Sequence, residues 1–355
     1  MTSSRTLFSG VTLVAALALG GIPSIAGAGH AAASTRPELQ RTGNLIISDQ
    51  FNNRAIQVDP RTNAITWQFG SGDPSLCNPG PGAIIGPNDA ESLPHGLAVL
   101  SGTGIPPGAS PYMPGGCVDN RVIVVDRSGN IVWQYGQAGV TGGGPNELNV
   151  PVFAIQLPNR NILITDQGNN RIIEVDRFNK NIDWYYGPLS GPGVLNNPNS
   201  AELLGNGHIL IADENNNRVI EVTRTGQIVW QYNRGLQLAA FASRLPNGDT
   251  LIVDSGHSRI LQVTPDKRIV FSYYTNAPGG NPSPLPTNAV RLADGNTMIA
   301  DQFNDRAILI ERGGDLVYQY GQTNMPGNGP GQLDAPYTAF RVGDYTGQTP
   351  PPSQF

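Results

Sequence analysis

The chain has 355 residues, with 22 basic and 27 acidic side chains and a net charge of −5 at pH 7. This mildly acidic balance, without any cluster of lysine or arginine, argues against nucleic acid or an anionic lipid surface as the main partner. Glycine (44) and proline (30) are abundant, but they lie between periodic apolar segments, so we interpret them as turns.

The first 33 residues have the features of an export signal. Arg5 is a basic start, residues 11–22 form an apolar run, and small residues follow. The run is about twelve residues long, short of the ~20 that a membrane-spanning helix needs, which favours cleavage over an anchor. We predict a signal peptide over 1–33, cleaved after Ala28 or Ala33, and a secreted or periplasmic protein with no membrane insertion.

An aromatic repeat dominates the rest of the chain. Each tryptophan stands two residues before another aromatic, a spacing that puts both rings on one face of a β-strand. The four strong units and two weaker ones are Trp67/Phe69, Trp133/Tyr135, Trp184/Tyr186, Trp230/Tyr232, Phe271/Tyr273 and Tyr318/Tyr320. A period of roughly 40–50 residues indicates a solenoid, a propeller or an array.

The unit between residues 151 and 187 predicts four short strands joined by tight turns. We expect them at Val152–Leu157, Asn161–Asp166, Arg171–Asp176 and Ile182–Tyr186. Such an antiparallel meander cannot bury both of its faces alone, so the units must stack on one another.

The turn between the second and third strands repeats as well. Six arginines begin third strands: Arg54, Arg121, Arg171, Arg218, Arg259 and Arg306. Five of them follow an aspartate by five residues: Asp49, Asp166, Asp213, Asp254 and Asp301. We interpret each pair as structural, with the carboxylate accepting backbone N–H groups and pairing with the arginine; the alternative is a ring of metal or catalytic aspartates. In unit two, Gly116 stands where the aspartate is expected, because an insertion over 101–116 enters there.

Two cysteines, Cys77 and Cys117, are present, and both fall in the longest insertion. In an exported protein such a pair predicts a disulfide, which would stabilise the fold by about 4 kcal/mol in the chain-entropy view. Two free thiols are the alternative.

The ends of the chain complement each other. The first unit lacks a good first strand, and the last segment, residues 336–342, matches the first strand of unit three. We therefore predict an all-β fold over 34–344: a six-bladed β-propeller of four-stranded antiparallel blades, closed by a C-terminal strand that completes the N-terminal blade. Residues 345–355 are expected to be a disordered, proline-rich tail.

Three segments carry a family likeness that covers nearly all of residues 40–343. Residues 327–336 (GNGPGQLDAP) and the turn at 166–171 (DQGNNR) resemble the NHL repeat. Residues 126–136 (DRSGNIVWQYG) also resemble the repeats of quinoprotein and arylsulfotransferase-type propellers. The resemblance implies a propeller fold but no single activity, because these propellers include scaffolds, lyases, sulfotransferases and dehydrogenases.

The enzymatic relatives imply residues that this chain places differently. NHL-type amidating lyases hold a metal with several axial histidines, and arylsulfotransferases rely on histidine, whereas His95, His208 and His257 fall in different parts of the repeat. Quinoprotein dehydrogenases usually close eight blades rather than six.

The starts of the first strands meet at one mouth of the axial channel, where we place the candidate ligand site. Its residues are Asn88, Asp89, Phe153, Asn199, Phe241, Asn288 and Tyr337; the polar ones could bind a ligand and the aromatic ones could stack a sugar or a flat molecule. Asp89, with Glu91 and Glu202 just inside, could hold one divalent cation such as calcium together with Asn199 and Asn288, because hard cations take carboxylate and amide oxygens. A solvated funnel is the alternative.

The connections between units are long and rich in glycine and proline, and they share one rim with the Asp/Asn turns. We therefore expect a monomeric, secreted binding or scaffold propeller that recognises a protein, glycan or envelope ligand through this rim, without dedicated catalytic residues. The alternatives are an exported metal-assisted lyase or hydrolase at the axial mouth, and a quinoprotein-like or arylsulfotransferase-like enzyme.

Overall fold

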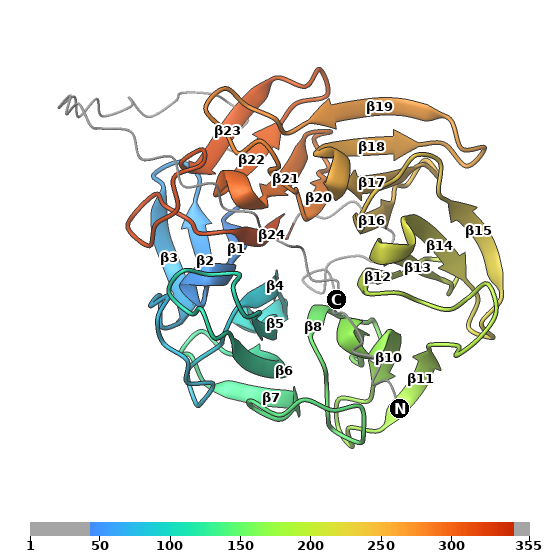
Figure 1. The fold of residues 1–355 in the computed structure, drawn as a ribbon, viewed down its shortest axis with the longest axis horizontal. Helices are drawn as coiled ribbons and strands as arrows, with labels where there is room; N and C mark the ends of the chain where they lie inside the picture. Colours follow the sequence, from blue (N-terminus) through green and yellow to red (C-terminus); the bar gives the residue numbers. More distant parts are fainter. Residues whose placement is uncertain (1–42, 344–355) are drawn as a thin grey trace, which may run out of the picture.

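The computed structural model describes residues 43–343, so the predicted signal peptide and the predicted tail lie outside the described residues. The expected all-β architecture is confirmed. Six four-stranded antiparallel sheets are arranged around a central axis as the blades of a propeller (Figure 1).

Each blade contributes one strand of each kind, counted from the axis outward. The inner strands are β4 (Pro87–Ser92), β8 (Pro151–Gln156), β12 (Pro198–Leu203), β16 (Ala239–Arg244), β20 (Asn288–Arg291) and β24 (Pro336–Arg341). The second strands are β1 (Leu45–Asp49), β5 (Ala98–Ile105), β9 (Ile162–Asp166), β13 (Ile209–Asp213), β17 (Thr250–Asp254) and β21 (Thr297–Asp301).

The third strands are β2 (Arg54–Asp59), β6 (Cys117–Val125), β10 (Arg171–Val175), β14 (Arg218–Val222), β18 (Arg259–Val263) and β22 (Arg306–Ile310). The outer strands are β3 (Ala64–Gly70), β7 (Ile131–Gly136), β11 (Ile182–Tyr186), β15 (Ile228–Tyr232), β19 (Ile269–Tyr274) and β23 (Leu316–Gly321). In five blades a single 3-10 turn joins the second strand to the third: η1 (Gln50–Asn52), η3 (Gln167–Asn169), η4 (Glu214–Asn216), η5 (Ser255–His257) and η6 (Gln302–Asn304).

The ring closes as the sequence predicts. β24, the last strand in the chain, pairs antiparallel with β1, placing Leu45 opposite Arg341 and Ile47 opposite Ala339. The first blade is therefore built from both ends of the described chain, in the order β24-β1-β2-β3. This closure leaves no inner strand without a partner, which protects the sheet edges nearest the axis.

The blade faces pack on one another through the second and third strands, which are almost entirely buried. The tryptophans of the outer strands also join neighbouring blades. The indole N–H groups of Trp133, Trp184 and Trp230 donate to main-chain carbonyls in the next blade, at Arg177, Arg224 and Pro265 respectively. Their repeated position thus reflects a repeated contact between blades.

The two rims of the propeller differ. The connections between blades and the five 3-10 turns that precede the third strands lie on one rim, which we call the long-loop rim. The opposite, short-turn rim carries the turns that follow the inner strands and those that precede the outer strands. In the part of the chain that the structure describes, no helix is long and apolar enough to cross a lipid bilayer.

Candidate functional site

The seven residues predicted for the axial mouth do meet at the long-loop end of the inner strands. Six of them are buried: Asn88, Asp89, Phe153, Asn199, Phe241 and Asn288. Tyr337 is the one that remains partly exposed. A ligand at the surface could therefore contact Tyr337 directly, whereas the other six side chains lie beneath the surface.

Hydrogen bonds connect opposite sides of this mouth. The Tyr337 hydroxyl, from the first blade, donates to Asn199 Oδ1, in the fourth, at 2.9 Å. A second chain of bonds runs from Gln302 Nε2 to Gln50 Oε1 at 2.9 Å, and from Gln50 Nε2 to Asn88 Oδ1 at 2.7 Å. The amide side chains of the mouth are thus engaged with one another.

The glutamines of this network were missed at the sequence level. Gln50, Gln167 and Gln302 each begin a 3-10 turn directly after the repeated aspartate, and Glu214 occupies the same position in the fourth blade. Gln167 Nε2 donates to Asn199 Oδ1 at 3.4 Å and to Glu214 Oε2 at 3.3 Å. Burial raises the pKa of Glu214 to about 7. The signal was the periodic polar residue after each aspartate.

One layer below, polar side chains tie four of the six inner strands to the next blade. Asp89 Oδ2 accepts the backbone N–H of Ala154 at 3.0 Å, and Asn288 Oδ1 accepts that of Ala339 at 3.3 Å. Ser200 and Thr338 accept the N–H groups of Ala242 and Ala90 in the same way. The alanine that recurs in all six inner strands therefore supplies an N–H group to the preceding blade in four of them.

In the two remaining blades a phenylalanine takes this position. Phe153 and Phe241 pack edge to face, with ring centroids 5.5 Å apart, across the intervening fourth blade. Both rings are buried and in contact with each other, so they fill the channel. These two rings could stack a sugar, as the sequence suggested, only if the mouth opened and separated them.

Three carboxyl groups line the channel below the mouth. Burial raises the pKa of Asp89 to about 7 and that of Glu202 well above its ordinary value. The pKa of Glu91 is raised well above its ordinary value by burial and by repulsion from Asp89 and Glu202. Among residues 43–343, however, no three His, Cys, Asp or Glu side chains converge as a metal-ligand group.

The three histidines of the described region lie in separate parts of the fold. His95 is exposed in a turn of the second blade, and His208 bonds Glu221 Oε1 at 2.7 Å on the short-turn rim. His257 lies on the long-loop rim, 3.0 Å from Asp254 Oδ2. They form no common centre.

The repeated aspartates and arginines anchor the long-loop rim. Asp166 Oδ2 binds Arg171 Nε at 2.6 Å, and its Oδ1 accepts the N–H of Asn149 in the incoming connection. The rest of the Arg171 guanidinium donates to the carbonyls of Gly143 and Glu147 in that connection. The predicted pairing is confirmed in all five blades. Each pair clamps the loop that enters its blade.

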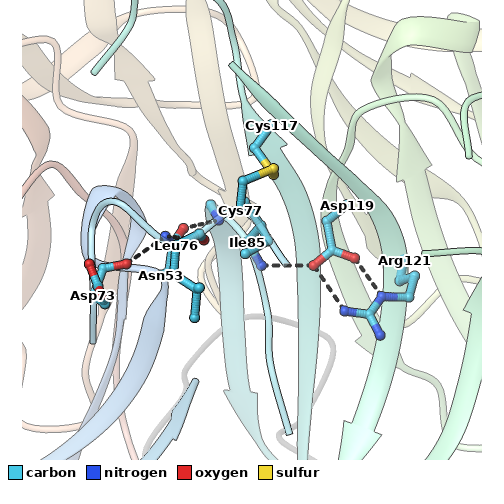
Figure 2. Close-up of a disulfide and its surroundings, with 9 residues drawn as sticks. Asn53, Asp73, Leu76, Cys77, Ile85, Cys117, Asp119 and Arg121 are labelled. Atoms are coloured by element: carbon cyan, nitrogen blue, oxygen red, sulfur yellow. Dashed lines mark hydrogen bonds and ion pairs between the residues drawn. A yellow bond between two sulfur atoms is a disulfide. The ribbon is translucent and has the colours of Figure 1, made fainter. Parts of the chain in front are cut away.

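The second blade anchors its incoming connection with different residues. The prediction that Gly116 takes the position of the missing aspartate was wrong. Gly102, not Gly116, lies opposite Arg121 in the position of the missing aspartate. The Asp119 carboxylate occupies the vacated space, since a Cβ on Gly102 would lie 2.6 Å from Asp119 Oδ2. Asp119 binds Arg121 and accepts the N–H of Ile85 at 2.8 Å (Figure 2).

A disulfide braces this part of the rim. Cys77, in the connection from the first blade, is bonded to Cys117 at the start of β6, as predicted (Figure 2). Beneath it, Met113 of the insertion belongs to a small apolar cluster with Phe51 and Phe303 of the first and sixth blades. The insertion thus extends β5 and β6 and is anchored on neighbouring turns. We call residues 70–87 and 101–118 the braced loops.

The braced loops expose apolar side chains. Leu76 is 39% exposed, Val118 43% and Tyr112 55%, although all three belong to segments held by the disulfide or the cluster. Asp73 is the only charged residue of 70–87, and 101–118 contains none. The surface is therefore apolar, rigidly backed and without a basic group.

Comparisons with known proteins agree with the fold. No family model matches the chain, and no curated protein matches it. A solved structure of a protein of unknown function from Bacteroides caccae is similar with a TM-score of 0.56 at 16% identity, covering 78% of this chain and 93% of that one.

A chain of the nidogen/laminin complex is similar with a TM-score of 0.52 at 12% identity, covering 78% of this chain and 92% of that one. A streptogramin B lyase reaches a TM-score of 0.48 at 17% identity, covering 71% and 72%. At these identities the first two likenesses show the propeller architecture alone.

Proposed function

We propose that this protein is an exported binding propeller that recognises a protein, glycan or other envelope ligand through its long-loop rim, with the braced loops as the main contact surface. The observation that carries the proposal is the exposure of Leu76, Tyr112 and Val118 on loops fixed by the Cys77–Cys117 disulfide. Exposed apolar groups on a pre-ordered surface lose little conformational entropy on binding, which favours recognition.

The charge of the surface formed by the braced loops indicates which ligands suit it. The arginines at the starts of the third strands are paired with aspartates, and the braced loops carry no basic residue. A polyanion would find no free cation there, so a neutral or cationic ligand suits this surface better. The disulfide also supports export, because such bonds persist in oxidising compartments.

The experiment is co-sedimentation of the mature protein with isolated cell envelopes. The variant Leu76→Ser with Tyr112→Ser should bind at least tenfold more weakly, because it removes two exposed apolar contacts without touching the core. Phe178→Ser is the matched control: Phe178 is 81% exposed, but on the short-turn rim. Absence of wild-type binding, or equal binding by all three proteins, would contradict the proposal.

A further inference from the structure

The axial channel contains carboxylate oxygens without donors. Glu202 is fully buried, and neither Oε1 nor Oε2 has a hydrogen-bond partner within residues 43–343. The Arg244 N–H and guanidinium lie close enough to favour the carboxylate, but neither meets hydrogen-bond geometry. Asp89 uses Oδ2 for Ala154, whereas its buried Oδ1 has no partner in the same range. Uncompensated buried carboxylates are strongly unfavourable, so something must neutralise them.

Glu91 faces the same space as Glu202. The two residues hold equivalent positions in β4 and β12, where they pair with Val99 and Leu210 of the second strands. The strands β4 and β12 flank β8 around the axis (Figure 1), and β8 contributes the apolar Ile155 at this level. The carboxylates of Glu91 and Glu202 therefore lie at the same level of the channel, on either side of the strand that contributes Ile155. Asp89 lies one layer nearer the mouth.

This part of the channel opens toward the short-turn rim. Toward the long-loop rim it is closed by Phe153, Phe241 and the bridging Tyr337. Glu91, in contrast, is partly exposed, as are the residues that follow it and Glu202, Ser92 and Leu203. Solvent thus reaches Glu91 from the side opposite the rim of the proposed function, whereas Glu202 lies deeper and is buried.

The nearby cation does not neutralise the channel, because it has another partner. Arg244 Nη2 binds Glu221 Oε2 at 2.9 Å, and its guanidinium lies over the Trp230 ring at 5.0 Å. None of the three channel acids, Asp89, Glu91 and Glu202, thus forms an ion pair with another described residue. Protonation would remove the charge of Glu202, but its two oxygens would still lack hydrogen-bond donors among the described residues.

We propose that a hydrated divalent cation of the calcium or magnesium class binds between Glu91 and Glu202, entering from the short-turn rim. Hard cations take carboxylate oxygens and keep several waters when few protein ligands are present. Two carboxylates with water are such a set, and the bound waters can donate hydrogen bonds to the remaining oxygens, including Asp89 Oδ1. The expected mouth ligands Asn199 and Asn288 are not used, since their oxygens already accept hydrogen bonds.

The test uses the mature protein, stripped with EDTA and passed into metal-free buffer. Calorimetric titration with calcium or magnesium chloride should show about one ion per chain, and either ion should raise the melting temperature. Glu202→Gln should weaken binding at least tenfold and abolish that rise, while Glu311→Gln, an exposed acid on the short-turn rim, should bind like the wild type. Glu91→Gln provides the same test if Glu202→Gln does not fold.

Two results would overturn the proposal. One is a wild-type protein that binds neither ion and melts at the same temperature with and without chelator. The other is a melting temperature that falls as pH rises from 5 to 8 regardless of added cation, with Glu202→Gln abolishing the fall, because protons alone would then neutralise the channel. Neither result bears on binding by the braced loops.

Discussion

The Asp–Arg clamps combine a buried ion pair with loop anchoring. Asp166 is fully buried and Arg171 nearly so, and both also bond the incoming connection. Removing the acid leaves a buried guanidinium without its counter-ion and frees the loop. We expect Asp166→Ala to lower the free energy of unfolding by about 3–5 kcal/mol in urea denaturation.

The exposed pair of Asp266 and Arg268 is the control for this clamp. Its side chains are 63% and 73% exposed, so Asp266→Ala should leave the free energy of unfolding close to that of the wild type. Equal losses for Asp166→Ala and Asp266→Ala would show that the clamps are not structural.

A second residue-level feature lies where the ring closes. Asp305 Oδ1 accepts the N–H of Ala335, and the N–H of Asp334 donates to Asp49 Oδ1. Burial and repulsion from Asp305 and Asp49 raise the pKa of Asp334 to about 7, while burial first, then repulsion from Asp49 and Asp301, raises that of Asp305 to about 6. These acids therefore favour the folded state most when protonated.

The sign of the pH effect follows from these raised values. The contribution of Asp334 is fully present below its ordinary pKa near 4 and is lost as pH rises toward 7, by at most about 1.4 kcal/mol per pH unit. Asp334→Asn should accordingly melt higher than the wild type at pH 8, with a smaller gap at pH 5. Thermal melts of the variant and the wild type at both pH values check this. For the control, the exposed Asp315→Asn, the difference in melting temperature from the wild type should be the same at both pH values. A larger difference between Asp334→Asn and the wild type at pH 5 than at pH 8 would contradict the account.

The sequence predicted residues that recur and failed where one blade departs from the repeat. The aspartates and arginines were found because identical contacts demand identical residues at a fixed spacing. Gly102 and Asp119 were missed because the acid moved from one strand to its partner, and only the pairing register reveals that exchange. Whether the predicted mouth residues bind a ligand remains a prediction.

At the level of elements, the tryptophans of the outer strands connect blades. Trp184 Nε1 donates to the Arg224 carbonyl at 2.9 Å, and the Arg224 guanidinium lies over the ring at 5.0 Å. Trp67 is the natural comparison, because its buried Nε1 has no partner within the described residues. Trp184→Phe should cost roughly 1–2 kcal/mol more than Trp67→Phe in urea unfolding, and equal costs would contradict a bridging role.

The disulfide acts on the braced loops as an element. Replacing Cys77 and Cys117 by serine should lower stability by up to about 4 kcal/mol and increase amide exchange in 70–87 and 101–118 more than in the strands. Wild-type protein with reductant should match the variant, and reductant should not affect the variant itself. Exchange that rises uniformly over all blades would contradict a local brace.

For the whole molecule, the central feature is ring closure, in which the two ends of the described chain pair with each other. Val342 N–H donates to the Asn44 carbonyl at 2.8 Å, so the start and end of the described chain lie side by side. Deleting residues 336–343 should expose β1 and replace cooperative unfolding with aggregation. A circular permutant that joins 343 to 43 and opens at Gly191, where a Cβ would meet open space, should keep the wild-type transition.

The architecture was predictable because six similar units must bury their faces on one another, and the mismatched ends permit one closure. The binding surface was less predictable. It depends on an insertion that folds onto turns of two other blades through Met113, and on exposure of single side chains, neither of which the repeat encodes.

The most direct test of rim recognition is photo-crosslinking to isolated cell envelopes. A photoreactive residue would replace Tyr112 on the braced loops or Phe178 on the short-turn rim, both of which are exposed. The account predicts covalent adducts from position 112, competed by unlabelled wild-type protein, and none from position 178. Adducts formed equally from both positions, or from position 178 alone, would contradict recognition through the long-loop rim.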